Sequence, residues 1–370
     1  MAIHFEHIDI RRFRGLKEVE IPGLRDVNII AGDNNSGKTS FMEALCLFRK
    51  PGDFYNVLKV TRMRDTSPLT SPAMYENFIA LFPKDEMYIG MHATGGIGES
   101  VIEIHGEEQK ELFNIEMMSP YDRMKYSKQS KPDIEQEITT FYGEMHGWDG
   151  RSSFRDSIRF NPFMKPSELS FRNKRYPDSI NIVYLSPLAH MQGGTFNKIV
   201  KNPEYKYICL RLLQLFDPEI VDLLYLKNEN TSRAIEYLEH KRLGIMPLAT
   251  YGDGIKKVLS LANGIASATG GVLLIDEIET SISYKYYSEI FDFIIMAAKQ
   301  FDVQVFITTH NAEAIDSMLE TQIYGKSKKY DPLSVITFRK DTETALVYTR
   351  SLSGREVYED RKSFKFEVRL

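Results

Sequence analysis

The stretch from Val27 to Thr39 reads VNIIAGDNNSGKT. Its first five residues are almost continuously apolar, which is typical of a strand buried in a sheet. The remainder satisfies the pattern Gly-x4-Gly-Lys-Ser/Thr of a phosphate-binding loop. After the loop, apolar residues at helical spacing predict a helix that continues to Arg49 and ends at Pro51-Gly52. A buried strand, a glycine-rich loop and a helix form the context that this motif requires, and they predict an α/β fold.

Each part of this loop has its own chemical task. Gly32 and Gly37 allow backbone N–H groups to turn toward phosphate, and the helix behind the loop adds its positive N-terminus. Lys38 is placed to reach the β and γ phosphates, and the Thr39 hydroxyl is placed to bind Mg²⁺. We therefore predict a site for nucleotide phosphates, with Thr39 as a metal ligand, formed by Asn34, Asn35, Ser36, Gly37, Lys38, Thr39 and Ser40.

A second apolar strand ends in two acidic residues. The run Gly271–Ile275 is followed directly by Asp276 and Glu277. By itself this pattern is also typical of a strand that enters an acidic turn, but together with a phosphate-binding loop it predicts functional carboxylates. Asp276 would hold Mg²⁺ through its hydration shell, and Glu277 would orient and deprotonate the attacking water.

A third apolar strand, Val303–Thr308, leads into Thr309 and His310. A lone histidine is more often structural or solvated. This one follows Asp276 by one helix and one strand, which places it where a histidine can contact the γ phosphate. We therefore predict that His310 is a catalytic residue.

The segment Tyr251, Gly252, Asp253 and Gly254 opens an apolar helix that extends to Ala268. Two glycines at this point would form a second anion-binding helix N-terminus. A turn and N-cap before a packing helix is the better explanation for Gly-Asp-Gly taken alone. The four residues are candidates for nucleotide binding, and both interpretations remain open at this stage.

The composition describes a globular chain without membrane or disulfide features. It has 370 residues, 47 Lys+Arg against 51 Asp+Glu, and a net charge of −4. Only Cys46 and Cys209 are present, which excludes a disulfide framework and fits a reducing compartment. No apolar run is long enough to span a bilayer, and no targeting segment is apparent, so we expect a cytoplasmic protein without a membrane partner. The balanced charge gives no global attraction to nucleic acid.

Four regions follow along the chain. Residues 1–50 and 246–370 carry the motifs and alternate strands with helices, as a mainly parallel sheet demands. Residues 51–180 contain strand-like runs around Met87–Met91 and Val101–His105, and predict an inserted antiparallel β subdomain with loops. Residues 181–245 begin with a strand at Ile182–Leu185 and then show helix-like spacing from Asn197 to Arg242, which predicts a helical lobe.

One stretch is strongly basic and rich in aromatic residues. Between Arg151 and Tyr176, seven basic residues alternate with five aromatic ones, against only Asp156 and Glu168. Such a stretch would supply phosphate and stacking contacts to DNA. A solvated loop or a protein-docking surface accounts for it equally well.

In their order along the chain, these features resemble an ABC-type ATPase of the RecF/SMC/OLD group, most closely its stand-alone AAA-like ATP-binding members. The resemblance covers about residues 2–48 and 246–316, and rests on Asn34–Thr39, Ile275–Glu279 and Gln304–His310. In this family Gly32–Thr39 would be the Walker A motif, Leu273–Glu277 the Walker B motif and Gly252–Gly254 the signature. One departure is that Thr280-Ser281-Ile282-Ser283 replaces the usual Gly-Leu-His segment.

The resemblance implies a fold, a reaction and partners. The fold would be an ABC-type P-loop head with a mainly parallel sheet, an antiparallel β subdomain and a helical insertion. ATP and Mg²⁺ would be bound between the Walker loop of one copy and the signature of another, so that ATP holds a homodimer or larger oligomer together. Such an ATPase would regulate a separate effector, for example a nuclease, in prokaryotic defence against phage; the alternative is a RecF-type ATPase of DNA repair or chromosome maintenance. The signature differs from that of transporter subunits, and no nuclease domain is expected after His310.

Overall fold

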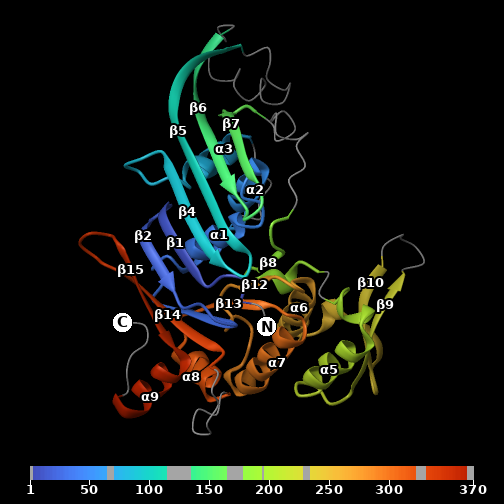
Figure 1. Cartoon of the computed structure of the whole chain (residues 1–370). Helices are drawn as coiled ribbons and strands as arrows, with labels where there is room; N and C mark the ends of the chain where they lie inside the picture. Colours follow the sequence, from blue (N-terminus) through green and yellow to red (C-terminus); the bar gives the residue numbers. More distant parts are fainter. Residues whose placement is uncertain are drawn as a thin grey trace. The chain divides into compact units, whose positions relative to one another are not determined.

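The computed structural model describes residues 3–64, 71–114, 135–164, 178–193, 196–227, 234–321 and 331–364 (Figure 1). The chain divides into two compact units. The first unit comprises Met1–His7, Glu20–Met42 and Ile180–Leu370, and the second comprises Ile8–Val19 and Glu43–Ser179. The first unit contains a six-stranded and a three-stranded sheet, and most of a second six-stranded sheet belongs to the second unit.

The first unit is built on a six-stranded, mainly parallel sheet. Its strands lie in the order β15 (Val347–Ser353), β14 (Leu333–Lys340), β3 (Val27–Ala31), β13 (Gln304–Thr309), β12 (Val272–Ile275) and β8 (Ile182–Leu185). All neighbours are parallel except β14 and β15, which are antiparallel. The carboxyl ends of β3, β13 and β12 therefore meet at one edge of the sheet. Ligand sites of open α/β sheets form at this kind of edge.

Helices cover this sheet because its central strands are buried throughout. Every residue of β3, β12 and β13 is buried. On helix α1 (Lys38–Leu47), the Phe41 ring packs 6.3 Å from the ring of Phe306 on β13 and 5.4 Å from that of Phe338 on β14. Helices α6 (Asp253–Ser267) and α7 (Tyr287–Gln300) contact each other (Figure 1). This unit also contains helices α8 (Ala312–Glu320) and α9 (Gly354–Phe364) and the short 3-10 turns η3 (Ala189–Met191), η4 (Ile199–Lys201), η5 (Leu248–Thr250) and η6 (Tyr284–Tyr286).

The predicted helical lobe is only partly helical. Helix α5 (Pro203–Leu213) forms as expected, but the residues after it form a three-stranded antiparallel sheet in the order β11 (Gly244–Pro247), β10 (Ala234–His240) and β9 (Ile220–Lys227). Helix α5 contacts β9 (Figure 1). The prediction of helix up to Arg242 was wrong because a short apolar run such as Ile220–Leu226 fits a strand and a helix equally well. Cross-strand pairing, which lies outside any local window, decides the outcome.

The second unit contains an antiparallel subdomain. Its six-stranded sheet has the order β2 (Leu16–Pro22), β1 (His7–Phe13), β4 (Tyr88–Gly95), β5 (Gly98–Asn114), β6 (Glu135–Trp148) and β7 (Ser153–Phe160). Strands β4 to β7 pair antiparallel in succession. Helices α2 (Phe54–Val60) and α3 (Ser71–Ile79), which sequence reasoning missed, contribute to an aromatic core in which Phe54, Phe78 and Phe160 pack edge to face at 5.2–5.9 Å.

A buried carboxylate in this unit is held between two arginines. Glu43, on α1, has a side chain that is 0% exposed. Its carboxylate lies 2.8 Å from Nε of Arg14 and accepts hydrogen bonds from Arg64 at 2.8 and 2.7 Å. Burial lowers the pKa of the Arg14 guanidinium, and the charge of Glu43 opposes this shift. The carboxylate is thus the counter-charge that allows Arg14 to be buried.

The α/β fold class predicted from the sequence is confirmed, apart from the helical character of the insertion. The expected strands before the phosphate-binding loop, the helix after it, and the alternating strands and helices of the last third all form. Helices α8 and α9 lie where no helix was predicted. In the described ranges, every helix is too short or too polar to cross a membrane.

Candidate functional site

The phosphate-binding loop adopts a tight conformation that specific residues permit. Gly32 has a φ of 147° and Gly37 a φ of 105°, both in the region that favours glycine. A Cβ atom at Gly32 would lie 2.3 Å from the carbonyl oxygen of Phe338, so no other residue fits there. Asn35 has a φ of 63°, which asparagine tolerates better than most residues. Asn34 and Asn35 are exposed, and Thr39 and Ser40 are half-buried.

Lys38 is buried inside the loop. Its side-chain Nζ donates hydrogen bonds of 2.7 Å to the carbonyl oxygens of Gly32 and Asp33. Burial lowers the pKa of its ammonium group, and the negative charges of Asp276, Glu277 and, less strongly, Glu279 oppose this shift. The lysine charge is therefore held in a low-dielectric loop that faces the acidic end of β12.

Asp276 joins three elements at the edge of the sheet. Its Oδ2 accepts hydrogen bonds from Thr39 Oγ1 at 3.3 Å and from the Tyr184 hydroxyl at 2.9 Å. Its Oδ1 accepts a hydrogen bond of 2.5 Å from Thr308 Oγ1. Thr39 and Asp276 are 237 positions apart in the sequence, and the parallel pairing of β3, β13 and β12 brings them together. The structure thus places both predicted metal-binding residues at one point.

Glu277 lies beside Asp276 in a backbone conformation that is rare for this residue type. Its φ is 48°, and its N–H donates to Thr308 Oγ1 at 2.8 Å. Left-handed conformations at residues other than glycine are costly and cluster at functional sites. The side chain is half-buried. The strain at Glu277 is consistent with a carboxylate held in place for a reaction.

His310 follows β13 and is bound to Glu279. Its Nδ1 lies 2.8 Å from Glu279 Oε1, and its backbone N–H donates to the same oxygen at 2.9 Å. The His310 side chain is 48% exposed and that of Glu279 is 10% exposed. His310 thus follows β13, the strand that lies between β3, which leads into the phosphate-binding loop, and β12, which leads into Asp276.

The residues present suit a nucleotide with a magnesium ion. Ser36 Oγ is buried and has no hydrogen-bond partner among the described residues, which leaves a polar atom available inside the loop. The hydroxyl of Thr39 and the carboxylate of Asp276 are oxygen ligands, the type that Mg²⁺ prefers. Gly32 leaves a cradle that a Cβ atom would fill.

Three further residues contact or face this site without having been predicted. Tyr184 and Glu279 make the bonds described above. The third, Lys257 on α6, is 3% exposed and donates to the Pro187 carbonyl oxygen at 3.3 Å. Burial lowers the pKa of Lys257 to about 8, although the charges of Glu279, Asp276 and Glu277 favour its protonated form. A basic residue one turn into an amphipathic helix was the only signal of this position in the sequence.

The segment Tyr251–Gly254 leads into helix α6. No hydrogen bond or ion pair joins it to Gly32–Thr39 within the described ranges. Gly252 and Asp253 are exposed, and a Cβ atom at Gly252 would meet nothing within 4 Å. Ser281, in the segment that replaces Gly-Leu-His, has a φ of 66° and keeps the conformation that glycine adopts most easily.

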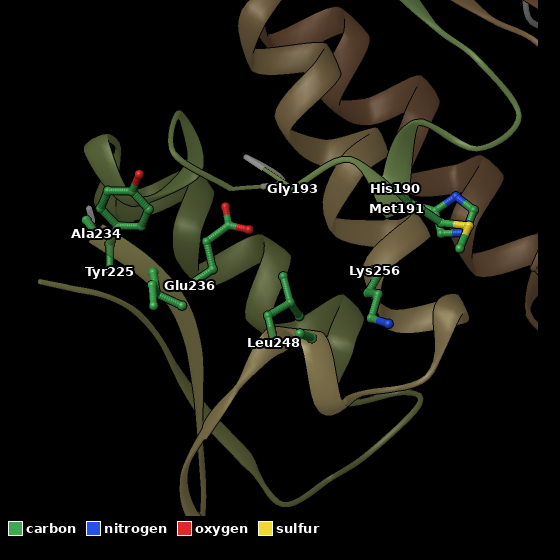
Figure 2. A pocket seen from close by; sticks show the side chains of 10 residues that line it. His190, Met191, Gly193, Tyr225, Ala234, Glu236, Leu248 and Lys256 are labelled. Atoms are coloured by element: carbon green, nitrogen blue, oxygen red, sulfur yellow. The ribbon is translucent and has the colours of Figure 1, made fainter. Parts of the chain in front are cut away.

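A pocket of about 380 Å³ lies next to this helix (Figure 2). Lys256 from α6, Leu248 from η5, and Tyr225, Ala234 and Glu236 from β9 and β10 line it. Its charged groups are already engaged, because Lys256 pairs with Asp253 at 3.3 Å and Glu236 accepts a hydrogen bond from the Phe196 N–H at 3.0 Å. We assign no catalytic role to this pocket.

Asp217, Glu219 and His240 form a second cluster, whose geometry suits a contact within the fold rather than a metal site. His240 Nε2 lies 3.3 Å from Asp217 Oδ2 and 3.5 Å from Glu219 Oε2. Its Nδ1 accepts backbone hydrogen bonds from Arg242 and Leu243, each at 3.1 Å. A neutral imidazole that accepts at Nδ1 carries its hydrogen on Nε2, and a nitrogen that carries hydrogen cannot ligate a metal. The two carboxylates therefore face an Nε2 that carries hydrogen and has no lone pair for a metal ion.

In the described part of the basic stretch, residues 151–164, two arginines form ion pairs with glutamates. Arg155 pairs with Glu144 at 2.7 Å, and Arg159 pairs with Glu111 at 2.9 Å. Phe160 is fully buried in the core of the second unit. Residues 165–176 of the stretch lie outside the described residues.

Comparison with known families gives two matches. A family model described as "AAA domain, putative AbiEii toxin, Type IV TA system" matches residues 125–316, and one described as "AAA ATPase domain" matches residues 1–144. The first of these covers half of the chain.

The chain is also similar to individual proteins. An "ATP/GTP phosphatase" from Helicobacter pylori is 22% identical over 84% of this chain and 86% of its own length. A "DNA replication and repair protein RecF" from Nitrosococcus oceani is 42% identical, but over only 17% of each chain. Among solved structures, an Smc head domain bound to the C-terminal domain of ScpA, derived from Pyrococcus furiosus, has a TM-score of 0.48 and 13% identity, and the match covers 98% of this chain and 100% of that one.

Proposed function

This chain belongs to the AAA-domain family whose model matches residues 125–316, and we propose that it is an ABC-type ATPase. It would hydrolyse ATP at the site formed by Lys38, Thr39, Asp276, Glu277 and His310. One observation carries the proposal. The Thr39 hydroxyl after the phosphate-binding loop lies 3.3 Å from the Asp276 carboxylate at the end of β12, so the two halves of an ATP–magnesium site meet.

Binding of ATP would begin with the loop. Backbone N–H groups of Asn34–Lys38, made accessible by the positive φ angles of Asn35 and Gly37, would surround the phosphates, and the N-terminus of α1 would add its dipole. Lys38 would exchange its bonds to the carbonyl oxygens of Gly32 and Asp33 for bonds to phosphate oxygens. An ammonium group that is already buried interacts strongly with an added negative charge.

Thr39 and Asp276 would hold Mg²⁺. The ion would supply charge that neutralises the phosphates during transfer. Tyr184 and Thr308 orient the Asp276 carboxylate by their hydrogen bonds of 2.9 and 2.5 Å. A carboxylate that is fixed on both oxygens loses less conformational freedom when it binds an ion.

Glu277 would accept the proton of the attacking water. Its backbone is fixed by the bond to Thr308, and its half-buried side chain lies at the same edge of the sheet as the loop. A carboxylate in this role contributes about 10²–10⁴-fold to the rate. His310, which follows the neighbouring strand, would contact the γ phosphate.

ATP would also join two copies of the chain. The exposed residues Gly252 and Asp253 at the N-terminus of α6 would cap the nucleotide held by another copy, since no bond links them to the loop of their own chain within the described residues. Hydrolysis would remove the contacts to the γ phosphate and open the homodimer or larger oligomer.

The output of this cycle would be control of a separate effector protein, such as a nuclease, in prokaryotic defence. The family description supports this direction, because it refers to a toxin of a toxin–antitoxin system. ATP-driven opening and closing would present or withdraw the surface that binds the effector.

A second candidate function is DNA binding in repair or chromosome maintenance. The short match to a DNA replication and repair protein favours it. Arg155 and Arg159 pair with glutamates, so the described part of the basic stretch has less charge to offer phosphate. If DNA binds, its affinity must fall steeply with salt, because each phosphate contact releases a counterion. If the chain does not bind duplex DNA, or if its affinity for DNA does not change with salt, the effector-regulating function is favoured.

Phosphate release from ATP tests the hydrolytic site. We expect the wild type to turn over ATP only with a divalent cation and Lys38→Ala to lose nucleotide binding. Glu277→Gln should bind ATP but hydrolyse it at least about 10²-fold more slowly than the wild type. Lys299→Ala, which removes an exposed lysine at the end of α7, is the matched control and should retain wild-type activity. Wild-type turnover by Lys38→Ala or by Glu277→Gln would rule out this site.

A further inference from the structure

Glu279 contacts both the ring and the backbone of His310, although the two residues are 31 positions apart in the sequence. A single carboxylate oxygen, Oε1, lies 2.8 Å from the ring Nδ1 of His310 and accepts a hydrogen bond of 2.9 Å from its backbone N–H. The two residues follow different strands, β12 and β13. Both the ring and the main chain of His310 therefore contact the segment after β12 that contains Asp276 and Glu277.

This contact determines which nitrogen of His310 remains available. An ionised carboxylate can only accept hydrogen bonds, so Nδ1 must carry the hydrogen. Nε2 is then the ring nitrogen that is left to meet a ligand, and the partner of one nitrogen sets the state of the other. The ring is 48% exposed, so Nε2 can be reached from outside the protein.

Glu279 is also buried more deeply than a surface brace would be. Its side chain is 10% exposed, and its second oxygen, Oε2, is buried and accepts no hydrogen bond from the described residues. Its charge is balanced at longer range, because it contributes the largest Coulombic effect on the buried Lys257 of α6. A buried carboxylate with an unused oxygen is costly, and such a cost is retained where the group has a role.

We propose that Glu279 is a positioning residue for His310, and that it holds the imidazole in the Nδ1–H form with Nε2 directed to the reacting phosphate. This inference rests on the proposed function, since it gives His310 its role in hydrolysis. Glu279 does not touch the nucleotide itself. It acts through His310, in the way that a partner of a metal-bound histidine fixes its tautomer and orientation.

A double-mutant cycle tests the route of action. We expect Glu279→Ala to lower kcat roughly tenfold or more, because small misplacements of reacting groups are costly, while the affinity for ATP stays unchanged. In a His310→Ala background the same substitution should have no further effect. Glu279→Gln, which keeps an acceptor for Nδ1–H, should restore part of the activity. Glu289→Ala, at an exposed position on α7, is the matched control.

A second measurement does not depend on turnover. In chains labelled with ¹⁵N-histidine at alkaline pH, NMR distinguishes the two neutral tautomers, and the His310→Ala spectrum identifies the resonances of His310. We expect the Nδ1–H form in the wild type and in Glu289→Ala, and the Nε2–H form in Glu279→Ala. An Nε2–H form in the wild type would overturn the proposal, as would a tautomer that Glu279→Ala leaves unchanged.

The two measurements separate this inference from the proposed function. If the chain fails to hydrolyse ATP but His310 changes tautomer in Glu279→Ala, the proposed function fails and the positioning of His310 stands. If hydrolysis is normal and Glu279→Ala lowers kcat equally with and without His310, Glu279 acts by another route and the inference is wrong.

Discussion

The Thr308 hydroxyl lies 2.5 Å from Oδ1 of Asp276 and links the ends of β13 and β12. The hydroxyl oxygen of Thr308 also accepts a hydrogen bond of 2.8 Å from the N–H of Glu277. One fully buried side chain therefore fixes a carboxylate and the backbone of the residue next to it. Neither Asp276 nor Glu277 can shift without breaking a bond to the strand that leads to His310.

Thr308→Val should damage the site while it preserves the volume of the side chain. The valine leaves the Glu277 N–H and one oxygen of Asp276 without their partner, which costs about 1–3 kcal/mol when such groups are buried. We expect a lower free energy of unfolding in urea and a lower kcat. Thr308→Ser keeps the hydroxyl and should retain most of the kcat. Equal losses of kcat in the two variants would contradict this role for the hydroxyl.

Gly252→Asn should separate assembly from folding. A Cβ atom at this position would meet nothing within 4 Å, and asparagine is a favourable N-cap residue for α6. We expect the free energy of unfolding to change by no more than about 0.5 kcal/mol, as is usual for surface substitutions. The ATP-dependent increase in mass should be lost. Normal assembly of this variant would place the contact between copies elsewhere.

Glu43→Gln should destabilise the second unit. The amide cannot balance Arg14, which burial already disfavours in its charged form, and removing one partner of a buried pair costs about 3–5 kcal/mol. Thermal unfolding measures the loss. Glu76→Gln removes an exposed carboxylate from α3 and should change the unfolding temperature little. If both variants unfold like the wild type, the buried pair does not stabilise the fold.

Lys257→Met should change how stability depends on pH. Burial lowers the pKa of Lys257 from 10.5 to about 8, so between these values the unfolded chain binds more protons than the folded one. The contribution of Lys257 to stability therefore rises with pH through this window. The free energy of unfolding of the wild type, relative to that of Lys257→Met, should increase by about 3 kcal/mol between about pH 7 and pH 10. A difference that is constant with pH would contradict the buried charge.

The sequence predicted the parts of the site that local patterns encode. Lys38, Thr39, Asp276 and Glu277 follow buried apolar runs, and parallel strands place their carboxyl ends side by side, so a motif in one run implies the position of the next. The assignment of catalytic and binding roles to these residues stays a prediction until the variants are measured.

The parts that could not be predicted depend on contacts between distant segments. Tyr184 reaches Asp276 across 92 positions, and its hydroxyl gives no signal in a strand that reads as apolar. Glu279 could be recognised as part of a motif, but its bond to His310 depends on the pairing of β12 with β13. Strands β9 and β10 lie in the stretch that was predicted as helix, because short aliphatic runs fit both periods. In each case the deciding interaction lies outside the local sequence.

The most direct test of the central claim is the mass of Glu277→Gln in solution with and without Mg-ATP, measured by light scattering. Without nucleotide, a monomer of 42.7 kDa is the reference. The account predicts that Mg-ATP at least doubles the mass of Glu277→Gln, and that Lys38→Ala shows no change. A Glu277→Gln chain that binds ATP and keeps the same mass would contradict an ATP-driven assembly.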